Sequence, residues 1–253
     1  KIHPGEPKSV MDFPPAAAVG NILVMALLIV HAPGQPIAAE RFVGEFETHV
    51  TVECADDHVV RRLEGWAAGR GIGFVHIVLA RGRMASQPMV TLGGAGTLSE
   101  QQRAALAAAD ELRSAGFEPV RVKIEATPWT RGVPRSDGEA ALLGRKVHFE
   151  HHIKVIVGQD LDRAAVAALV SGHGAHVSWN ARRFMDGGRQ QRFVTQRCYG
   201  VGLHAAGERL ERLVGVICGA GYEIDSVERE FVVYDSNSAI DDGWMERGEG
   251  RKR

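Results

Sequence analysis

One short pattern occurs twice in this chain and constrains its fold more than any other feature. Residues 46–52 read Phe-Glu-Thr-His-Val-Thr-Val, and residues 149–155 read Phe-Glu-His-His-Ile-Lys-Val. Both segments alternate apolar and polar side chains, which is typical of a β-strand with one buried face. The histidines shared by the two segments, His49 and His152, are 103 residues apart. We therefore predict that most of the chain consists of two consecutive copies of one structural unit.

The two copies can be followed along the chain at a nearly constant offset. His76 and His176 are 100 residues apart, and Glu125 and Glu230 are 105 residues apart. Strand-like alternation and helix-like spacing of apolar residues predict the order β-α-β-β-α-β in each copy. The first copy is predicted to comprise strand 46–53, helix 56–70, strands 72–80 and 87–92, a helix from the capping-box pattern at 99–102 to Gly116, and strand 119–126. The corresponding elements of the second copy are predicted at 149–157, 161–171, 175–180, 192–199, 206–221 and 224–234.

This order of elements is that of the ferredoxin-like fold, in which two helices cover one face of an antiparallel sheet. We predict an α+β protein with two tandem ferredoxin-like units, whose uncovered sheet faces meet across a central cleft or in a barrel. Residues 235–237 and 241–244 are predicted either to close the mouth of the cleft or to form turns. The expected parts are a disordered or non-native leader at 1–42, units at 43–127 and 146–237, a linker at 128–145 and a polar tail at 238–253.

Composition narrows the range of partners and compartments. The formal net charge of the 253 residues is −1, so no overall field attracts duplex nucleic acid or a membrane surface. The three cysteines form no CxxC pair, and their low, odd number is typical of a reducing compartment. We therefore expect a cytoplasmic protein. The apolar segment at 16–30 is shorter than the roughly 20 residues of a spanning helix, and export or anchoring is the alternative that it leaves open.

The predicted strands place histidines and carboxylates on the uncovered sheet faces, because side chains alternate between the two faces of a strand. Histidine titrates near neutral pH and can both donate and accept a proton. We therefore predict an acid–base site with His49 and His152 as the catalytic pair, against the alternative of two buried structural histidines. The residues predicted to line the same faces, and to orient the histidines or bind substrate, are Glu47, Glu150, Glu125, Glu230, His76 and His176.

Cationic residues on the second copy suggest that the ligand is an anion. Lys154 and Arg197 lie in the middle of predicted strands, where a charge needs a partner, and guanidinium groups match phosphate and carboxylate geometry. Arg182 and Arg183 lie in a predicted hairpin, where charges are usually solvated. A divalent metal held by histidine and glutamate is the alternative to cofactor-free chemistry. Because the chain has no HxH or HExxH motif, we assign no metal ligands.

Two resemblances to known families add to these predictions. His49-Val50-Thr51 resembles the HxT motif of two-histidine phosphoesterases, which include cyclic phosphodiesterases and RNA-end ligases and have one HxT or HxS motif in each of two lobes. The resemblance implies that His49 and His152 act as general acid and base and that Thr51 holds a phosphate. Lys154 stands where the second motif has Thr or Ser, and a lysine can also hold phosphate.

The second resemblance covers most of residues 46–244. The strings HFEHHIKV, RFVTQRCYG and EREFVVYDSN are similar to an uncharacterised family of bacterial hypothetical proteins, which implies no activity. The residues and the first resemblance together predict an enzyme that acts on a phosphorylated or anionic small molecule, or on a nucleotide end, with a phosphoesterase as the leading class. The alternatives are a non-catalytic ligand-binding or interaction module and a metal-dependent enzyme that uses the same face. The oligomeric state is left open.

Overall fold

The computed structural model describes residues 40–158, 163–181 and 190–244, all of which belong to one compact unit. The predictions for the apolar segment at 16–30, for Arg182 and Arg183, and for the tail beyond residue 244 lie outside the described residues. Within the described part of the chain, no helix is long and apolar enough to cross a membrane.

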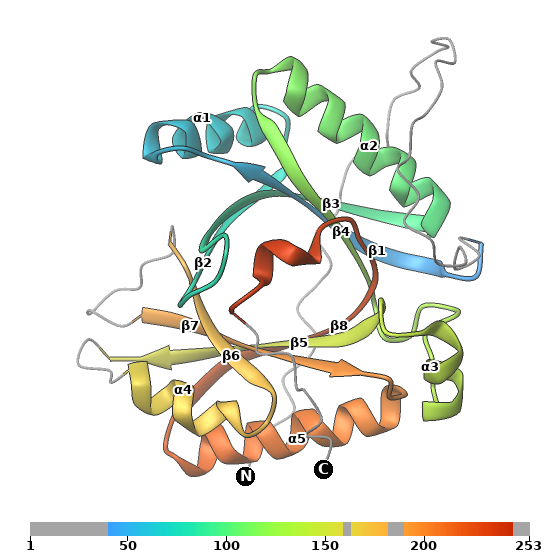
Figure 1. Ribbon diagram of the computed structural model, residues 1–253, viewed down its shortest axis with the longest axis vertical. Coiled ribbons are helices and arrows are strands. Elements are labelled where there is room, and N and C mark those ends of the chain that lie inside the picture. The colour runs from blue at the N-terminus through green and yellow to red at the C-terminus, as the bar shows by residue number, and fades with distance from the viewer. Residues whose placement is uncertain (1–39, 159–162, 182–189, 245–253) are drawn as a thin grey trace. The chain divides into compact units, whose positions relative to one another are not determined.

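Both halves of the described chain show the predicted order β-α-β-β-α-β (Figure 1). The first half comprises β1 (Val43–Glu53), α1 (Asp57–Ala68), β2 (Gly73–Leu79), β3 (Ser86–Thr97), α2 (Leu98–Ser114) and β4 (Glu118–Ala126). The second half comprises β5 (His148–Val157), α4 (Arg163–Ser171), β6 (Ala175–Asn180), β7 (Gln190–Tyr199), α5 (Leu203–Gly219) and β8 (Glu223–Asp235). A short helix, α3 (Asp137–Leu143), connects the halves, and a 3₁₀ turn, η2 (Ser238–Asp241), follows β8.

The eight strands form one antiparallel sheet that closes into a barrel in the order β1-β3-β2-β6-β7-β5-β8-β4. Each half contributes four neighbouring strands, and the halves join where β2 pairs with β6 and where β4 pairs with β8. The α+β prediction is therefore confirmed. Figure 1 shows α1 and α2 outside the strands of the first half, α4 and α5 outside those of the second, and η2 between the two sets of strands.

Apolar cores lie between the helices and the outer face of the barrel. Leu63 of α1 and Leu112 of α2 pack on Val50 and Val90 of the first half. Leu213 of α5 belongs to the equivalent core of the second half. With the apolar residues outside, the alternating polar residues of the strands are left to face the lumen of the barrel.

The helix ends follow from local sequence. Asp56 caps α1, where its carboxylate accepts a hydrogen bond of 2.9 Å from the Val59 amide. Helix α2 begins earlier than predicted, because Thr97 and Glu100 form the capping box and Ser99 already lies inside the helix. The pattern Thr-x-x-Glu at 97–100 satisfies two free amide donors at once, which accounts for this start.

The predicted linker at 128–145 is a structured part of the core. Ser136 and Glu139 form a second capping box that starts α3. Val133 and Leu143 are buried beside Phe149 and Phe231, in a cluster that draws on both halves. The stretch predicted as the linker therefore contains a short helix and contributes buried side chains to the core.

The first seven residues of the predicted polar tail are also part of the folded unit. Ile240 and Trp244 are buried, and the amides of Arg83 and Met84 in the β2–β3 turn donate hydrogen bonds to the carbonyls of Asp242 and Ile240 at 2.8 and 3.0 Å. We refer to residues 236–244 as the C-terminal segment. The boundary predicted at residue 237 is therefore too early.

We predict that Leu112→Ala will lower the free energy of unfolding by about 2–5 kcal/mol, because this side chain is fully buried and its loss leaves a cavity. Leu106→Ala in the same helix is the matched control: Leu106 is 48% exposed, and the expected loss is below about 1 kcal/mol. Urea unfolding followed by circular dichroism measures both values. Equal losses in the two variants would contradict the orientation of α2 on the barrel.

Candidate functional site

The two halves place one histidine each in the same local setting inside the barrel. Nδ1 of His49 lies 3.0 Å from Oγ1 of Thr91, and Nδ1 of His152 lies 3.0 Å from Oγ1 of Thr195. Each threonine lies directly opposite its histidine on the neighbouring strand, β3 or β7. The threonines fix one edge of each ring, so that Nε2 is directed at the acidic side chains of the lumen.

Each Nε2 atom lies between two glutamates. For His49, Oε2 of Glu125 is 3.0 Å away and Oε1 of Glu47 is 3.7 Å away. For His152, Oε1 of Glu150 is 3.3 Å away and Oε2 of Glu230 is 3.4 Å away. All four predicted glutamates therefore lie beside the predicted histidines, in an arrangement that the two halves share.

Lys123 joins the two histidine clusters across the barrel. Its ammonium group lies 2.8 Å from Oε1 of Glu125 and 3.0 Å from Oε1 of Glu150. Both carboxylates are almost completely buried. Since Glu125 belongs to the first half and Glu150 to the second, the ion pairs form a single network that spans both halves.

Glu150 has two further partners on its other oxygen, the cationic Arg197 and His148, whose pKa is lowered by burial. The Arg197 guanidinium donates a hydrogen bond from Nε to Oε2 of Glu150, and Nε2 of His148 lies 3.2 Å from the same oxygen. Arg197 also donates from its terminal nitrogen to Oδ2 of Asp241 at 2.8 Å. The arginine predicted to hold a ligand anion thus holds two carboxylates of the protein itself.

The network sets the charge states of the two histidines. Burial by itself would lower the pKa of His152, but the hydrogen bonds and charges of Glu150 and Glu230 outweigh it and raise that pKa to about 10. Burial also opposes the charge on His49, and the carboxylate of Glu125 again prevails, so the pKa of His49 is raised. His152 is therefore an imidazolium at neutral pH, and the surroundings of His49 favour its protonated form.

The carboxylates divide into two kinds. Burial would raise the pKa of Glu125, but Lys123 and His49 hold it well below the ordinary value. Burial and the nearby Glu125 raise the pKa of Glu230. Glu230 is thus the carboxylate beside His152 that accepts a proton more readily, and the pair can pass one proton between carboxylate and imidazole.

The next residue along β5 shows the opposite behaviour. His151 points to the outer face of the barrel, where its Nδ1 lies 3.1 Å from Oε1 of Gln196. Burial there lowers the pKa of His151 to about 4. Adjacent histidines on one strand therefore have opposite charge states at neutral pH, because alternation sends one toward carboxylates and the other into an apolar core.

One predicted site residue faces the wrong way. Gly73 of β2 lies opposite Thr91, the threonine that contacts His49, whereas His76 lies opposite Pro88. Alternation then places His76 on the helix-covered face, where Nε2 lies 2.8 Å from Oγ of Ser86. The prediction that His76 lines the open face was wrong.

The other predicted residues occupy the lumen side of the barrel. His176 lies opposite Thr195, the position that Gly73 has in the first half, and its ring is 6.0 Å from that of Trp244. Lys154 forms an ion pair with Glu228. Thr51 is buried on β1, four residues beyond Glu47 and close to the end of the strand. These three residues belong to the same face of the barrel as the histidine network.

Several residues of the network were not predicted as site residues. His148 precedes the predicted start of its strand, although its spacing of two from Glu150 signals the same face. Lys123 precedes Glu125 by two residues on its strand, which signals the same face. Asp241 has no periodic signal, because it is the last residue of the short 3₁₀ turn η2 that follows the last strand.

Three groups of the network have their ligand atoms within 4.8 Å of one another and can act as a metal site: Glu125, Glu150 and His152. Both oxygens of Glu125 form ion pairs but no well-oriented hydrogen bond within the described part of the chain. Carboxylate and imidazole ligands suit divalent zinc, manganese or iron. In this structure the Lys123 ammonium lies between the two carboxylates, where it neutralises them as a metal would.

The side chains around the histidines keep some contact with solvent. His49, His152 and Lys123 are 15%, 20% and 12% exposed, and Glu47 is 47% exposed. Water therefore reaches the side chains of this part of the lumen. An imidazolium with one nitrogen fixed and the other shared with carboxylates can donate a proton to a bound group and recover it from its neighbours.

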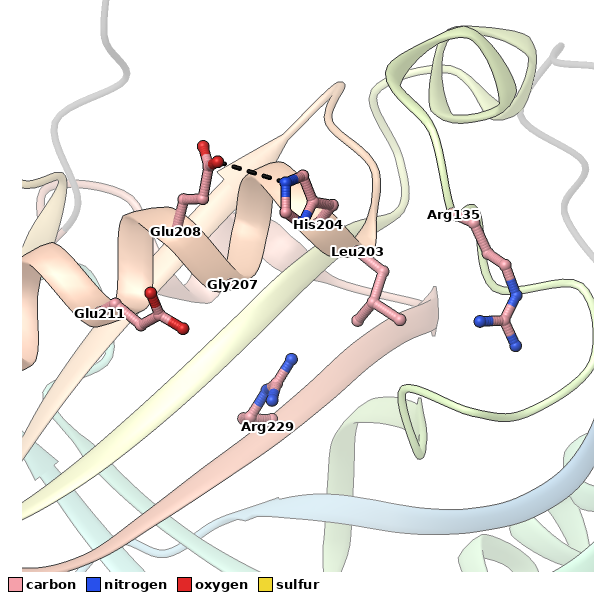
Figure 2. A pocket seen from close by; sticks show the side chains of 7 residues that line it. All are labelled: Arg135, Leu203, His204, Gly207, Glu208, Glu211 and Arg229. Atoms are coloured by element: carbon pink, nitrogen blue, oxygen red, sulfur yellow. Dashed lines mark ion pairs between the residues drawn. The ribbon is translucent and has the colours of Figure 1, made fainter.

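A separate hollow of about 450 Å³ lies on the outside of the barrel (Figure 2). Its lining consists of Arg135, Leu203, His204, Gly207, Glu208, Glu211 and Arg229. Figure 2 shows it between the start of α5, strand β8 and the chain before α3. None of the predicted site residues lines this hollow.

Comparison with known proteins assigns no family. No family model matches the chain, and no curated protein matches it. Among solved structures, the small subunit of acetolactate synthase from Thermotoga maritima is similar at 13% sequence identity and a TM-score of 0.27. The match covers 76% of this chain and 95% of that one. A likeness this slight carries no conclusion about fold or function.

We predict that His152 stays protonated between about pH 6 and 9 while His151 stays neutral, since the folded pKa values are about 10 and about 4. Nitrogen-15 NMR of the imidazole groups measures both states, with His152→Gln to assign the signal. Because the folded pKa of His152 lies above its ordinary value of 6.5, its contribution to stability is complete below pH 6.5 and is lost as the pH rises through about 10. Titration of His152 near 6.5 would contradict the ion-pair network.

Proposed function

We propose that the protein is an enzyme that transfers protons to and from a small anionic substrate inside the barrel, with His49 and His152 as the acid–base pair. The repeated arrangement of threonine, histidine and two glutamates supports this proposal most directly. A buried structural histidine is satisfied by one partner at each ring nitrogen, whereas Nε2 of each of these rings faces two carboxylates and keeps contact with solvent. A phosphoester is the substrate class that the resemblance to two-histidine phosphoesterases favours.

The surroundings of the two histidines suggest different roles. His152 has two carboxylates at 3.3 and 3.4 Å and a strongly raised pKa, which suits a general acid that protonates the leaving oxygen. His49 has one close carboxylate, while the more distant Glu47 is half exposed. Transfer of the His49 proton to solvent through Glu47 would leave a neutral imidazole, which can then accept a proton from the attacking hydroxyl or water.

The anionic group of the substrate needs cations near the histidines. Lys154 lies two residues beyond His152 on the same face of β5, roughly 7 Å along the strand. Its partner Glu228 is half exposed, so the ammonium can exchange that carboxylate for a ligand phosphate. Thr51 stands in the corresponding place on β1. These two residues are the proposed contacts to the phosphate.

A metal-dependent enzyme is the second candidate, and the close approach of Glu125, Glu150 and His152 supports it. Binding of a metal there would require the Lys123 ammonium to leave its position between the carboxylates. The proton-transfer proposal needs no such rearrangement and is therefore preferred. Metal analysis of the purified protein and assays with and without EDTA distinguish the two candidates.

The test is turnover of 2′,3′-cyclic nucleotides by the wild type, His49→Ala and His152→Ala. Each variant is expected to lose a factor of about 10²–10⁴ in kcat/KM, since each removes one proton-transfer group. His204→Ala is the matched control, because His204 is 88% exposed on α5, and its activity should equal that of the wild type.

The other outcomes each favour a different function. Activity that EDTA abolishes would replace the two-histidine mechanism with the metal-dependent one. Activity that survives in both histidine variants would remove these residues from the mechanism. A folded wild type without turnover on these nucleotides would contradict the phosphoesterase proposal and favour a binding module.

A further inference from the structure

A carboxylate from the C-terminal segment is held inside the barrel by three polar side chains. Oδ1 of Asp241 accepts hydrogen bonds from Nε2 of Gln87 at 2.9 Å and from a terminal nitrogen of Arg121 at 3.2 Å. Oδ2 accepts a hydrogen bond from Arg197 at 2.8 Å. The three donors come from β3, β4 and β7, so both halves of the barrel contribute hydrogen bonds to this carboxylate.

All of these groups are buried. Asp241, Arg121 and Gln87 are only 3–5% exposed. The charges of Arg121 and Arg197 lower the pKa of Asp241 although burial opposes this, so the carboxylate is ionised. A carboxylate with hydrogen bonds to both oxygens, two of them from guanidinium groups, is the arrangement by which proteins recognise free carboxylates and phosphates.

The guanidinium groups are oriented without the help of Asp241. Arg121 makes two hydrogen bonds to Asp235, at 2.9 and 2.6 Å, and Arg197 is bound to Glu150. Each arginine thus has one permanent carboxylate partner from a strand and turns a remaining donor toward Asp241. Withdrawal of Asp241 would leave a preorganised cationic pocket with its donors in place.

The segment that carries Asp241 belongs to no strand, and hydrogen bonds of Ser236 and Asn237 to β4 hold its start. It follows β8 and meets the β2–β3 turn through two backbone hydrogen bonds. Trp244 is the last residue of the segment. Its indole nitrogen donates a hydrogen bond of 3.3 Å to the Val177 carbonyl, and its ring lies beside the Arg197 guanidinium. Figure 1 shows this segment between the two sets of strands. A segment after the last strand can withdraw without breaking the barrel.

We propose that Arg121, Arg197 and Gln87 form an oxyanion-binding site, and that Asp241 is its internal occupant, which a carboxylate or phosphate group of a ligand replaces. The C-terminal segment then acts as a built-in competitor for the ligand. The inference rests on the proposed function only where it takes the ligand to be the substrate of the enzyme. Binding of an anion to the site can be measured without turnover.

The test is thermal unfolding of Asp241→Ala in rising concentrations of sodium formate, acetate or phosphate, against sodium chloride at equal ionic strength. Removal of the carboxylate leaves a space that formate matches in size and charge. The Tm of the variant is expected to rise by about 5 °C or more at concentrations well above Kd, and to keep rising with the logarithm of the anion concentration. Phosphate as the better ligand would indicate a phosphate ester, and formate or acetate a carboxylate.

Two matched variants make the result specific. Asp242→Ala removes the same charge from the neighbouring exposed residue and should respond like the wild type. Asp241→Ala combined with Arg197→Gln should lose at least tenfold in apparent anion affinity. An equal response of Asp241→Ala, Asp242→Ala and wild type would overturn the proposal.

If Asp241→Ala does not fold, the same binding measurements are made on Asp241→Asn, because the amide keeps the shape of the aspartate side chain but loses its charge. It should bind phosphate or formate at least tenfold more tightly than the wild type, because the competitor is weakened. Unchanged affinity in a folded Asp241→Asn protein would overturn the proposal. Since none of these measurements uses turnover, a negative phosphoesterase assay leaves their outcome unaffected.

Discussion

Burial of charge inside a closed barrel is the constraint on which the rest of this structure depends. An isolated carboxylate taken out of water costs several kcal/mol, and only close, well-oriented cations offset that cost. Glu150 shows how the chain meets this demand, because Arg197, Lys123 and His152 all lie against one carboxylate. Charge, and not apolar packing, thus decides which side chains can face the lumen.

This constraint couples the two halves of the chain. Lys123 of β4 lies between Glu125 of its own strand and Glu150 of β5, and β8 stands between those strands in the barrel. Each half also supplies cations for its own buried carboxylate: Lys123 and His49 for Glu125, and His152 and Arg197 for Glu150. The contact between Lys123 and Glu150 adds a link between the two clusters, which therefore form one network in the closed barrel.

Strand alternation was enough to predict much of the site from the sequence. It placed His49 with Glu47, and His152 with Glu150, on the correct face, because both strands are long and regular. It failed at His76, since the register of β2 depends on the β2–β3 turn and not on an offset counted from the other half. Asp241 could not be predicted, because its position depends on three distant side chains and on no local pattern.

Arg197 gives the two sites a physical connection. Its Nε holds Glu150, which contacts His152, while its terminal nitrogen holds Asp241. A guanidinium is planar and rigid, so a change in one of its carboxylate partners tilts the donors offered to the other. Replacement of Asp241 by a ligand anion would therefore act on the position of Glu150, and through Glu150 on the proton affinity of His152. Occupancy of the oxyanion site and acidity of the histidine are linked by this one side chain.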